Sequence, residues 1–253
     1  MSEAPPPSEP QSQAPHPVLP EYYERADQRR KFLREIFDRT ASDYDATERL
    51  FSFGTGSGYR RMALRRAGLD TGMHVLDVAV GTGLVAREAL HVVGARGLVV
   101  GVDPSWGMLS SAPQVASMPL VQGTSERLPF ASARFDFLSL GFALRHLSEL
   151  DAVFGEFRRV LKPGGIVCLL EITPPERLWV RRLLKLYLRH IAPVASRLVA
   201  RQPETPRLLR YFWDTIEACV PPQGVLEALH HAGFTDVRRH VEAHLFSEYT
   251  ARR

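Results

Sequence analysis

Short apolar runs alternate with amphipathic segments through the middle of the chain. The segments 84–93 and 150–161 repeat their apolar residues at the spacing of a helix. Around them lie runs that are apolar almost throughout, at 74–78, 98–103, 120–122, 135–140 and 166–170. Strands of this composition are buried on both faces, which is typical of a parallel sheet covered by helices. The pattern predicts an α/β fold with a Rossmann-like, doubly wound, mostly parallel sheet.

The segments that flank this core predict helical additions. Four apolar residues share one helical face early in the chain: Phe32, Leu33, Ile36 and Phe37. This face predicts an N-terminal helical lid over 21–70, ahead of a core over 71–171. A helical stretch from Glu176 to Ala200, broken near Pro193, predicts a helical cap over 172–222. A helix and two strands over 223–253 predict an antiparallel strand at the C-terminal edge of the sheet.

The composition predicts a disordered N-terminal tail and a cytoplasmic location. Residues 1–20 hold seven prolines and no aromatic residue, so we expect a disordered tail in front of a single domain over 21–253. The chain of 253 residues is 45% hydrophobic and carries a net charge of +4, as soluble globular proteins do. No apolar run reaches the roughly 18 residues that span a bilayer, and no signal peptide is recognisable. Cys168 and Cys219 are expected to be reduced thiols in the cytoplasm.

The candidate chemistry begins where the first apolar run ends. Asp77 closes that run, and a turn with Gly81, Thr82 and Gly83 leads into the next helix. The second apolar run ends in Asp103, twenty residues after Gly83. A strand, a glycine turn, a helix and a strand ending in an acid form the layout with which Rossmann-like sheets hold a nucleotide. The glycines let the backbone approach the ligand, and the second acid can accept hydrogen bonds from ribose hydroxyls.

The position of Asp77 bears on which nucleotide is bound. Residues 81–86 formally match G-x-G-x-x-A, so a nicotinamide-dependent dehydrogenase has to be considered. A pyrophosphate at this turn needs backbone N–H groups and a positive helix end, and the carboxylate of Asp77 would repel it. A carboxylate suits a cationic ligand better, such as the amino group of a methionine moiety near a sulfonium.

Four motifs, in this order and spacing, resemble class I S-adenosylmethionine-dependent methyltransferases: DVAVGTG, VVGVDPSWGML, GTSERLPFASARFDFLSL and LKPGG. A narrower resemblance covers nearly the whole folded chain. YDATERLFSFG, YRR, GFALRH and LLEITPP are similar to the menaquinone/ubiquinone-pathway C-methyltransferases. The chain is therefore expected to be a methyltransferase that uses S-adenosyl-L-methionine, without a metal ion.

The resemblance assigns roles to individual residues. It implies that the cofactor is bound by Asp77, Gly81, Thr82, Gly83, Asp103, Pro104, Thr124, Ser125 and Gly141. It places Tyr44 of the lid, Arg145 and His146 on the acceptor side as candidate catalytic residues. Arg145 can hold an oxyanion, and His146 is the candidate general base. The alternatives are an ion pair of Arg145 with Glu171 or Asp151 and a structural role for His146.

Departures from the family's pattern concern the acceptor side. Thr47-Glu48 stands where the family has Asn-Asp, and His146 replaces an asparagine. Gly56 replaces a histidine and Val80 a glycine. The acceptor is accordingly expected to be a quinol or another phenolic aromatic, most simply methylated on carbon. The alternatives are an O-methyltransferase of a phenolic or polyketide natural product and a non-catalytic protein that keeps the fold.

Basic residues recur every fourth position in the predicted cap: Arg177, Arg181, Lys185 and Arg189. A basic amphipathic helix over 177–201 can rest on an anionic membrane, which would make the protein peripheral to it. The alternative is an ordinary solvated helix face. Nucleic acid is not expected as a partner. The sequence leaves the oligomeric state open, with a homodimer as one option.

Overall fold

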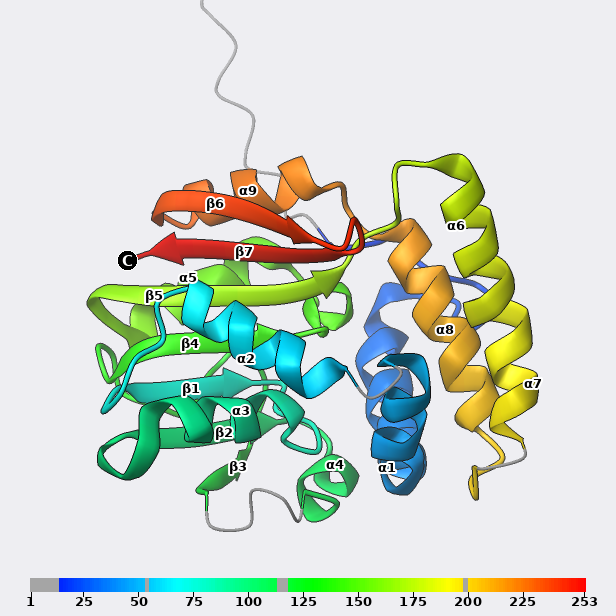
Figure 1. Cartoon of the computed structure of the whole chain (residues 1–253), viewed down its shortest axis with the longest axis horizontal. Coiled ribbons are helices and arrows are strands. Elements are labelled where there is room, and N and C mark those ends of the chain that lie inside the picture. The colour runs from blue at the N-terminus through cyan, green and yellow to red at the C-terminus, as the bar shows by residue number, and fades with distance from the viewer. Residues whose placement is uncertain (1–13, 53–54, 113–117, 198–199) are drawn as a thin grey trace, which may run out of the picture.

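A seven-stranded sheet forms the centre of the molecule (Figure 1). The structure, a computed structural model, describes residues 14–52, 55–112, 118–197 and 200–253. The strands in chain order are β1 (His74–Val78), β2 (Leu98–Asp103), β3 (Leu120–Gln122), β4 (Phe135–Gly141), β5 (Leu161–Ile172), β6 (Thr235–Glu242) and β7 (Phe246–Arg252). Their order in the sheet is β3-β2-β1-β4-β5-β7-β6.

The first five strands are parallel, as the apolar runs predict. β1 pairs with β2 on one side and with β4 on the other, so the chain changes direction across the sheet between β1 and β4. β7 pairs antiparallel with both β5 and β6, which confirms the antiparallel C-terminal addition, although β6 forms the edge. In open sheets of this kind, ligands bind outside the carboxyl ends of the strands where the order reverses.

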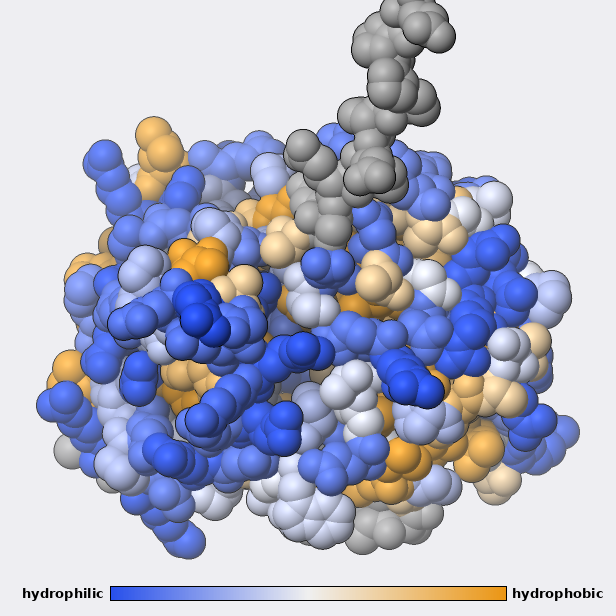
Figure 2. All heavy atoms as spheres, turned by 180° about the vertical axis from the view of Figure 1, so that it is seen from behind, coloured by the Kyte–Doolittle hydropathy of each residue, from blue (hydrophilic) through white to orange (hydrophobic). Residues whose placement is uncertain are grey.

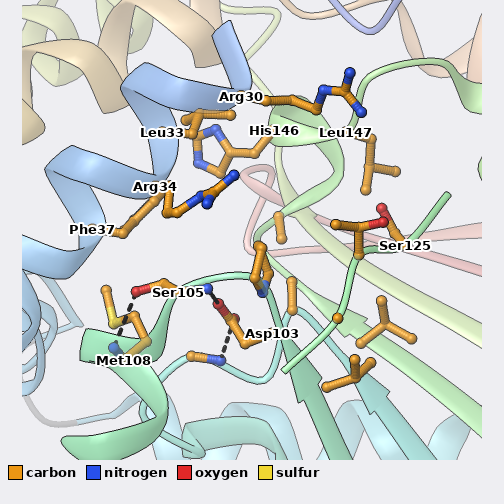
Figure 3. Close-up of a pocket in the computed structure, with 18 of the residues that line it drawn as sticks. Arg30, Leu33, Arg34, Phe37, Asp103, Ser105, Met108, Ser125, His146 and Leu147 are labelled. Atoms are coloured by element: carbon orange, nitrogen blue, oxygen red, sulfur yellow. Dashed lines mark hydrogen bonds between the residues drawn. The ribbon is translucent and has the colours of Figure 1, made fainter. Parts of the chain in front are cut away.

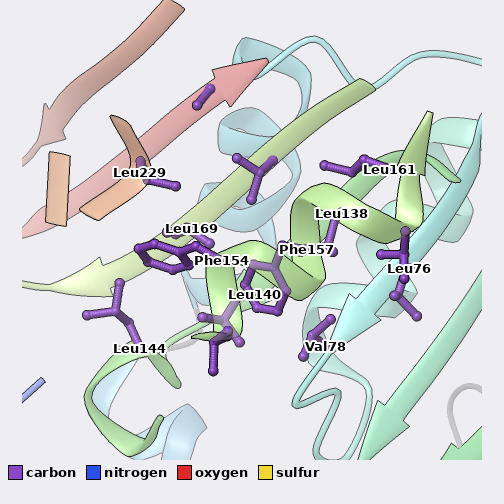
Figure 4. Packing of buried hydrophobic residues seen from close by; sticks show 14 of the residues in the cluster. Leu76, Val78, Leu138, Leu140, Leu144, Phe154, Phe157, Leu161, Leu169 and Leu229 are labelled. Atoms are coloured by element: carbon purple, nitrogen blue, oxygen red, sulfur yellow. The ribbon is translucent and has the colours of Figure 1, made fainter. Parts of the chain in front are cut away.

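Alternate residues of each strand fill two separate cores, because neighbouring side chains of a strand point to opposite faces. On one face, Leu76 and Leu138 pack against Phe154 and Phe157 (Figure 4). On the other face, Val75 and its neighbours in the sheet pack against a second set of helices. The first set is α5 (Leu150–Val160) and α9 (Pro222–His231), and the second is α2 (Gly56–Arg66) and α3 (Leu84–Val93). The sheet is therefore doubly wound, as expected.

The lid and the cap stand together at one end of the sheet (Figure 1). The lid consists of the short η1 (Ala26–Gln28) and the long α1 (Arg29–Ser52), and the cap of α6 (Leu178–Lys185), η5 (Leu186–Ile191), α7 (Ala192–Ser196) and α8 (Thr205–Ala218). A third core joins α1 to α8 through Leu33, Ile36, Leu208 and Tyr211. Three further short helices lie within the described residues, η2 (Gly94–Arg96), α4 (Trp106–Ser110) and η4 (Leu144–His146). Among the described residues, no helix combines the length and apolar character that crossing a bilayer requires.

Two expectations about the flanking segments are corrected. The cap helix does not break at Pro193, which lies at the start of α7, directly after η5 in a continuous helical run. The irregularity comes just before it, where η5 is π-helical. The expected tail is wrong for residues 14–20, because His16 is buried against Arg29 and the carbonyl of Pro15 accepts a hydrogen bond from the Val220 N–H. Residues 1–13 lie outside the described part of the chain.

Candidate active site

The glycine turn after β1 closes onto the end of β2. Gly81 and Gly83 have φ angles of 56° and 89°, in the left-handed region that favours glycine. Ala79 also has a positive φ of 52°, so the turn is strained as well as tight. The N–H of Val80 bonds to the carbonyl of Val102 in β2 at 3.1 Å. The turn is therefore fixed at the carboxyl ends of β1 and β2, as the sequence predicted.

Asp103 connects the turn to the start of α4. Its Oδ2 accepts a hydrogen bond from the Gly81 N–H at 2.9 Å, and its Oδ1 accepts one from the Ser105 N–H at 2.8 Å (Figure 3). Burial raises the pKa of Asp103 to about 6, against the opposing effect of these two hydrogen bonds. Each oxygen keeps a second lone pair, so the carboxylate can still accept hydrogen bonds from a ligand.

Asp77 is buried at the end of β1 with one oxygen unused. The Ser139 hydroxyl donates to Oδ1 at 2.6 Å, whereas Oδ2 has no hydrogen-bond partner among the described residues. Burial raises the pKa of Asp77 to about 7. A buried carboxylate oxygen without a partner is costly unless a cation comes to it. An amino group brought to this oxygen would compensate its charge.

A cleft opens beside these residues, between the sheet and α1. Eight of the sequence-predicted site residues line it: Tyr44, Gly81, Asp103, Pro104, Thr124, Ser125, Gly141 and His146. We call it the donor cleft. Thr82, Gly83, Asp77 and Arg145 are not part of its wall. The Thr82 hydroxyl instead donates to Asp45 of α1 at 2.6 Å, and so ties the turn to the lid.

The lid forms part of the wall of the donor cleft through residues that were not predicted from the sequence. Arg30, Leu33, Arg34 and Phe37 of α1 line the donor cleft (Figure 3). The apolar face that predicted the helix was the available signal for two of them. Asp38 of the same helix accepts hydrogen bonds from the Ser105 hydroxyl and the Gly107 N–H, and thereby docks α1 on α4.

A second cavity adjoins the donor cleft, and we call it the inner cavity. Tyr44 and Phe142 line both spaces, so they form the boundary. The rest of its wall is largely apolar and comes mostly from the cap: Ile172, Leu184, Tyr187, Leu188, Leu209, Phe212, Ile216, Leu245 and Phe246. Polar side chains reach it as well, among them Glu48, Arg60 and Arg145. A molecule in the inner cavity would lie next to one in the donor cleft.

Arg145 and His146 are separated by the structure. Arg145 lines the inner cavity, where its guanidinium is buried, lies 5.4 Å from the Phe212 ring centroid and is ion-paired with Glu171. The ion pair that the sequence left as an alternative is therefore present. His146 lines the donor cleft, and its ring stacks on Tyr211 with centroids 5.6 Å apart.

The electrostatic state of His146 follows from its surroundings. Neither ring nitrogen has a hydrogen-bond partner among the described residues. Burial, reinforced by the positive charge of Arg145, holds the pKa of His146 well below 6.5. The imidazole is therefore neutral at pH 7 and keeps a free lone pair, but it is a weak base.

The fold and the site together define an S-adenosylmethionine-dependent methyltransferase. Solved structures agree on the fold. A SAM-dependent methyltransferase from Aquifex aeolicus aligns with a TM-score of 0.56 at 18% identity, over 91% of this chain and 99% of its own. Phosphoethanolamine N-methyltransferase 2 of Haemonchus contortus, in complex with S-adenosylhomocysteine, aligns with a TM-score of 0.60 at 16% identity, over 87% of this chain and 59% of its own. The unused oxygen of Asp77 and the lone pairs of Asp103 fit such a cofactor.

The sequence places the protein more narrowly. The model of the ubiE/COQ5 methyltransferase family matches residues 24–244, so the chain belongs to this family. Curated relatives carry the name ubiquinone/menaquinone biosynthesis C-methyltransferase. That of Syntrophotalea carbinolica is 35% identical over 81% of this chain and 86% of its own length. That of Shewanella piezotolerans is 29% identical over 84% and 86%.

Proposed function

We propose that the protein methylates a quinol or related phenolic aromatic on a ring carbon, in the inner cavity. The observation that carries the proposal is the junction of an apolar cavity with the donor cleft at Tyr44 and Phe142. The names of the curated relatives support the same class of acceptor. An apolar cavity with a few buried polar groups is the usual form of a site for an aromatic small molecule.

On the donor side we assign Asp77 to the amino group of the cofactor and Asp103 to its ribose. When bound, S-adenosyl-L-methionine supplies an electrophilic methyl group. Gly81, Pro104, Thr124, Ser125 and Gly141 shape the cleft around it. Thr82 and Gly83 act indirectly. The Thr82 hydroxyl bonds the turn to the lid, and Gly83 is the N-cap of α3.

On the acceptor side the residues orient the ring and control its charge. Phe142 has a φ of 59° and its N–H bonds to the Leu170 carbonyl at 2.7 Å, so its strained backbone is held between the two spaces. The permanent charge of Arg145 stabilises a phenolate, whose electron density makes the ring carbon nucleophilic. Burial raises the pKa of Tyr44, so its hydroxyl stays protonated and can donate to the acceptor oxygen. His146 lines the donor cleft and not the inner cavity, but its neutral imidazole, which has no hydrogen-bond partner among the described residues, remains our candidate to accept the proton.

Labelled S-adenosylmethionine and a panel of quinols and phenols test this function. We expect label to enter a quinol, and proton NMR of the product to show a methyl group on carbon. A methoxy signal would favour the alternative, an O-methyltransferase of phenolic natural products. Absence of transfer to every aromatic in the panel would overturn the acceptor class.

The cap suggests how a lipid-soluble acceptor reaches the inner cavity, although not through the face that the sequence indicated. Arg181 and Lys185 form ion pairs with Glu217 of α8, and Arg189 pairs with Asp214. These ion pairs bind the cap together, so the basic side chains do not form the free cationic face that the sequence indicated. The exposed face of the same helices is apolar instead: Leu178, Trp179, Leu183, Leu186, Ile191 and Val194. At the left edge of Figure 2, the side on which α6 and α7 lie, hydrophobic residues reach the surface among hydrophilic ones.

We propose that this outer face contacts an anionic membrane. Arg177, Arg182 and Arg197 are exposed along it and form no ion pair with any described residue, so they complement anionic headgroups. Co-sedimentation with phosphatidylglycerol vesicles is expected for the wild type and reduced for Leu183→Ser/Leu186→Ser. Met62→Ser removes an exposed apolar residue on α2 and serves as the control. Loss of a dimer in the double variant, without any vesicle binding by the wild type, would instead make this face a homodimer interface.

A further inference from the structure

The inner cavity contains a second buried cation besides Arg145. Arg60, on α2, is only 4% exposed, although three other arginines of this helix, Arg61, Arg65 and Arg66, lie nearer the surface. Its Nη2 donates to Glu48 at 2.7 Å, and its Cζ lies 5.4 Å from the centroid of the Phe142 ring. Glu48 and Phe142 both line the inner cavity, so the guanidinium between them is part of its wall.

The hydrogen bonds of Arg60 are incomplete. A guanidinium has five N–H donors, and the Nε of Arg60 is buried without a partner among the described residues. A buried donor that loses water and gains no acceptor is destabilising. Glu48 neutralises the charge but occupies only the Nη2 donor, so the guanidinium that lines the cavity keeps further N–H donors.

Arg145 repeats the same arrangement elsewhere in the wall. It is also buried, also paired with one carboxylate, and its Nε also lacks a partner among the described residues. Its guanidinium lies over Phe212, whereas that of Arg60 lies over Phe142. Tyr44 lies within electrostatic reach of both, since Arg145 and Arg60 each lower its pKa against the dominant effect of burial. One largely apolar cavity thus offers buried donors at two separate places.

Building on the proposed function, we propose that Arg60, held by Glu48, binds a second oxygen of the acceptor and so selects aromatic rings with two oxygen substituents over rings with one. Arg145 holds the first oxygen. An acceptor with a single hydroxyl leaves one guanidinium donor unmatched, and sites that hydrogen-bond a substrate hydroxyl discriminate strongly against analogues that lack it.

Two naphthalenes that differ by one hydroxyl provide the probe. We would measure the dissociation constants of 1,4-dihydroxynaphthalene and 1-naphthol by calorimetry, without oxygen and with saturating S-adenosylhomocysteine. The wild type is expected to bind the diol about 10- to 100-fold more tightly. The variant Arg60→Met/Glu48→Gln removes both charges together, and is expected to bind the diol as weakly as 1-naphthol while its affinity for 1-naphthol stays unchanged.

Arg65→Gln is the matched control, because Arg65 lies on the same helix, is exposed and forms no ion pair with a described residue. It should preserve the selectivity. If the double variant lost affinity for both ligands equally, or for neither, the proposal would be overturned. If the double variant does not fold, the single variant Glu48→Gln tests the proposal instead. Its guanidinium, freed from the ion pair, is expected to bind the diol at least as tightly as in the wild type. Weaker binding of the diol would contradict the proposal.

The outcome for the wild type separates this inference from the proposed function. Equal binding of the diol and the naphthol would refute only the role of Arg60. Binding of neither compound would count against the aromatic acceptor itself.

Discussion

Replacing Asp77 by asparagine tests the cofactor site through its effect on stability. Asp77 is 1% exposed, and the Ser139 hydroxyl donates a hydrogen bond to its Oδ1. The amide of asparagine has nearly the same shape and carries no charge. We therefore expect Asp77→Asn to stabilise the cofactor-free protein at alkaline pH and to weaken cofactor binding.

The size of the effect follows from the pKa. Burial raises the pKa of Asp77 from 3.8 to about 7 in the folded protein. The folded state then binds more protons than the unfolded state between these values, so stability falls as the pH rises through this window. The full difference above pH 7 corresponds to roughly 4 kcal/mol, an upper figure for the gain in Asp77→Asn. At pH 4 most of this gain disappears.

Urea unfolding at pH 5 and pH 8, with and without S-adenosylhomocysteine, measures both effects. The variant should have the higher midpoint at pH 8 without ligand, and a smaller increase when ligand is added. In the wild type, affinity for the ligand should rise from pH 5.5 to pH 8 as Asp77 ionises. If the variant were less stable than the wild type at pH 8, the hypothesis that ionised Asp77 lacks a compensating cation would be refuted. A variant with the full ligand-induced increase would refute the assignment of Asp77 to the cofactor.

Further predictions concern the turn, the lid and the two candidate catalytic residues. Asp103→Ala should abolish binding of S-adenosylmethionine in calorimetry, since the two carboxylate oxygens accept hydrogen bonds from the glycine turn and from the start of α4. Gly107→Ala should cost about 1–3 kcal/mol in urea unfolding, because its Cβ would lie 2.7 Å from the backbone of α1; Gly155→Ala, in a helix with open space, should be neutral or stabilising. His146 should show no NMR titration step near pH 6.5. Arg145→Ala should keep cofactor binding and lower turnover. It should also lower the free energy of unfolding by about 3–5 kcal/mol, because the carboxylate of Glu171 would stay buried without its cation.

The strands and the glycine turn were predictable because their signals are local. β1 and β2 have the bounds that their apolar runs indicate, since a strand buried on both faces tolerates few polar residues. Asp103 could be placed in the site for the same reason: it ends a strand next to the switch of strand order. Its two hydrogen-bond donors, by contrast, belong to the turn and to α4, and their geometry is not encoded in the spacing.

What the sequence could not show are contacts between distant segments. Arg181 and Lys185 looked like a free basic face because their partner, Glu217, follows more than thirty residues later. His16 looked like part of a tail because the residue that buries it, Arg29, belongs to the lid. Helical periodicity shows which residues share a face. It does not show whether that face meets water, lipid or another helix.

The two cavities hold different buried charged groups, and their placement suits methyl transfer. The donor side holds two buried carboxylates, Asp77 and Asp103, although Arg30 and Arg34 also line the donor cleft. The inner cavity holds two buried guanidinium groups, Arg60 and Arg145, each paired with a glutamate. Under the proposed function, a cationic sulfonium lies near carboxylates and an anionic acceptor near guanidinium donors, with Phe142 between them. Transfer of the methyl group neutralises both charges, so a surrounding of low polarity favours the transition state over the separated ions. The apolar wall of the inner cavity thus contributes to the reaction as well as to binding the ring, and a polar residue introduced there should lower turnover more than it lowers affinity for the acceptor.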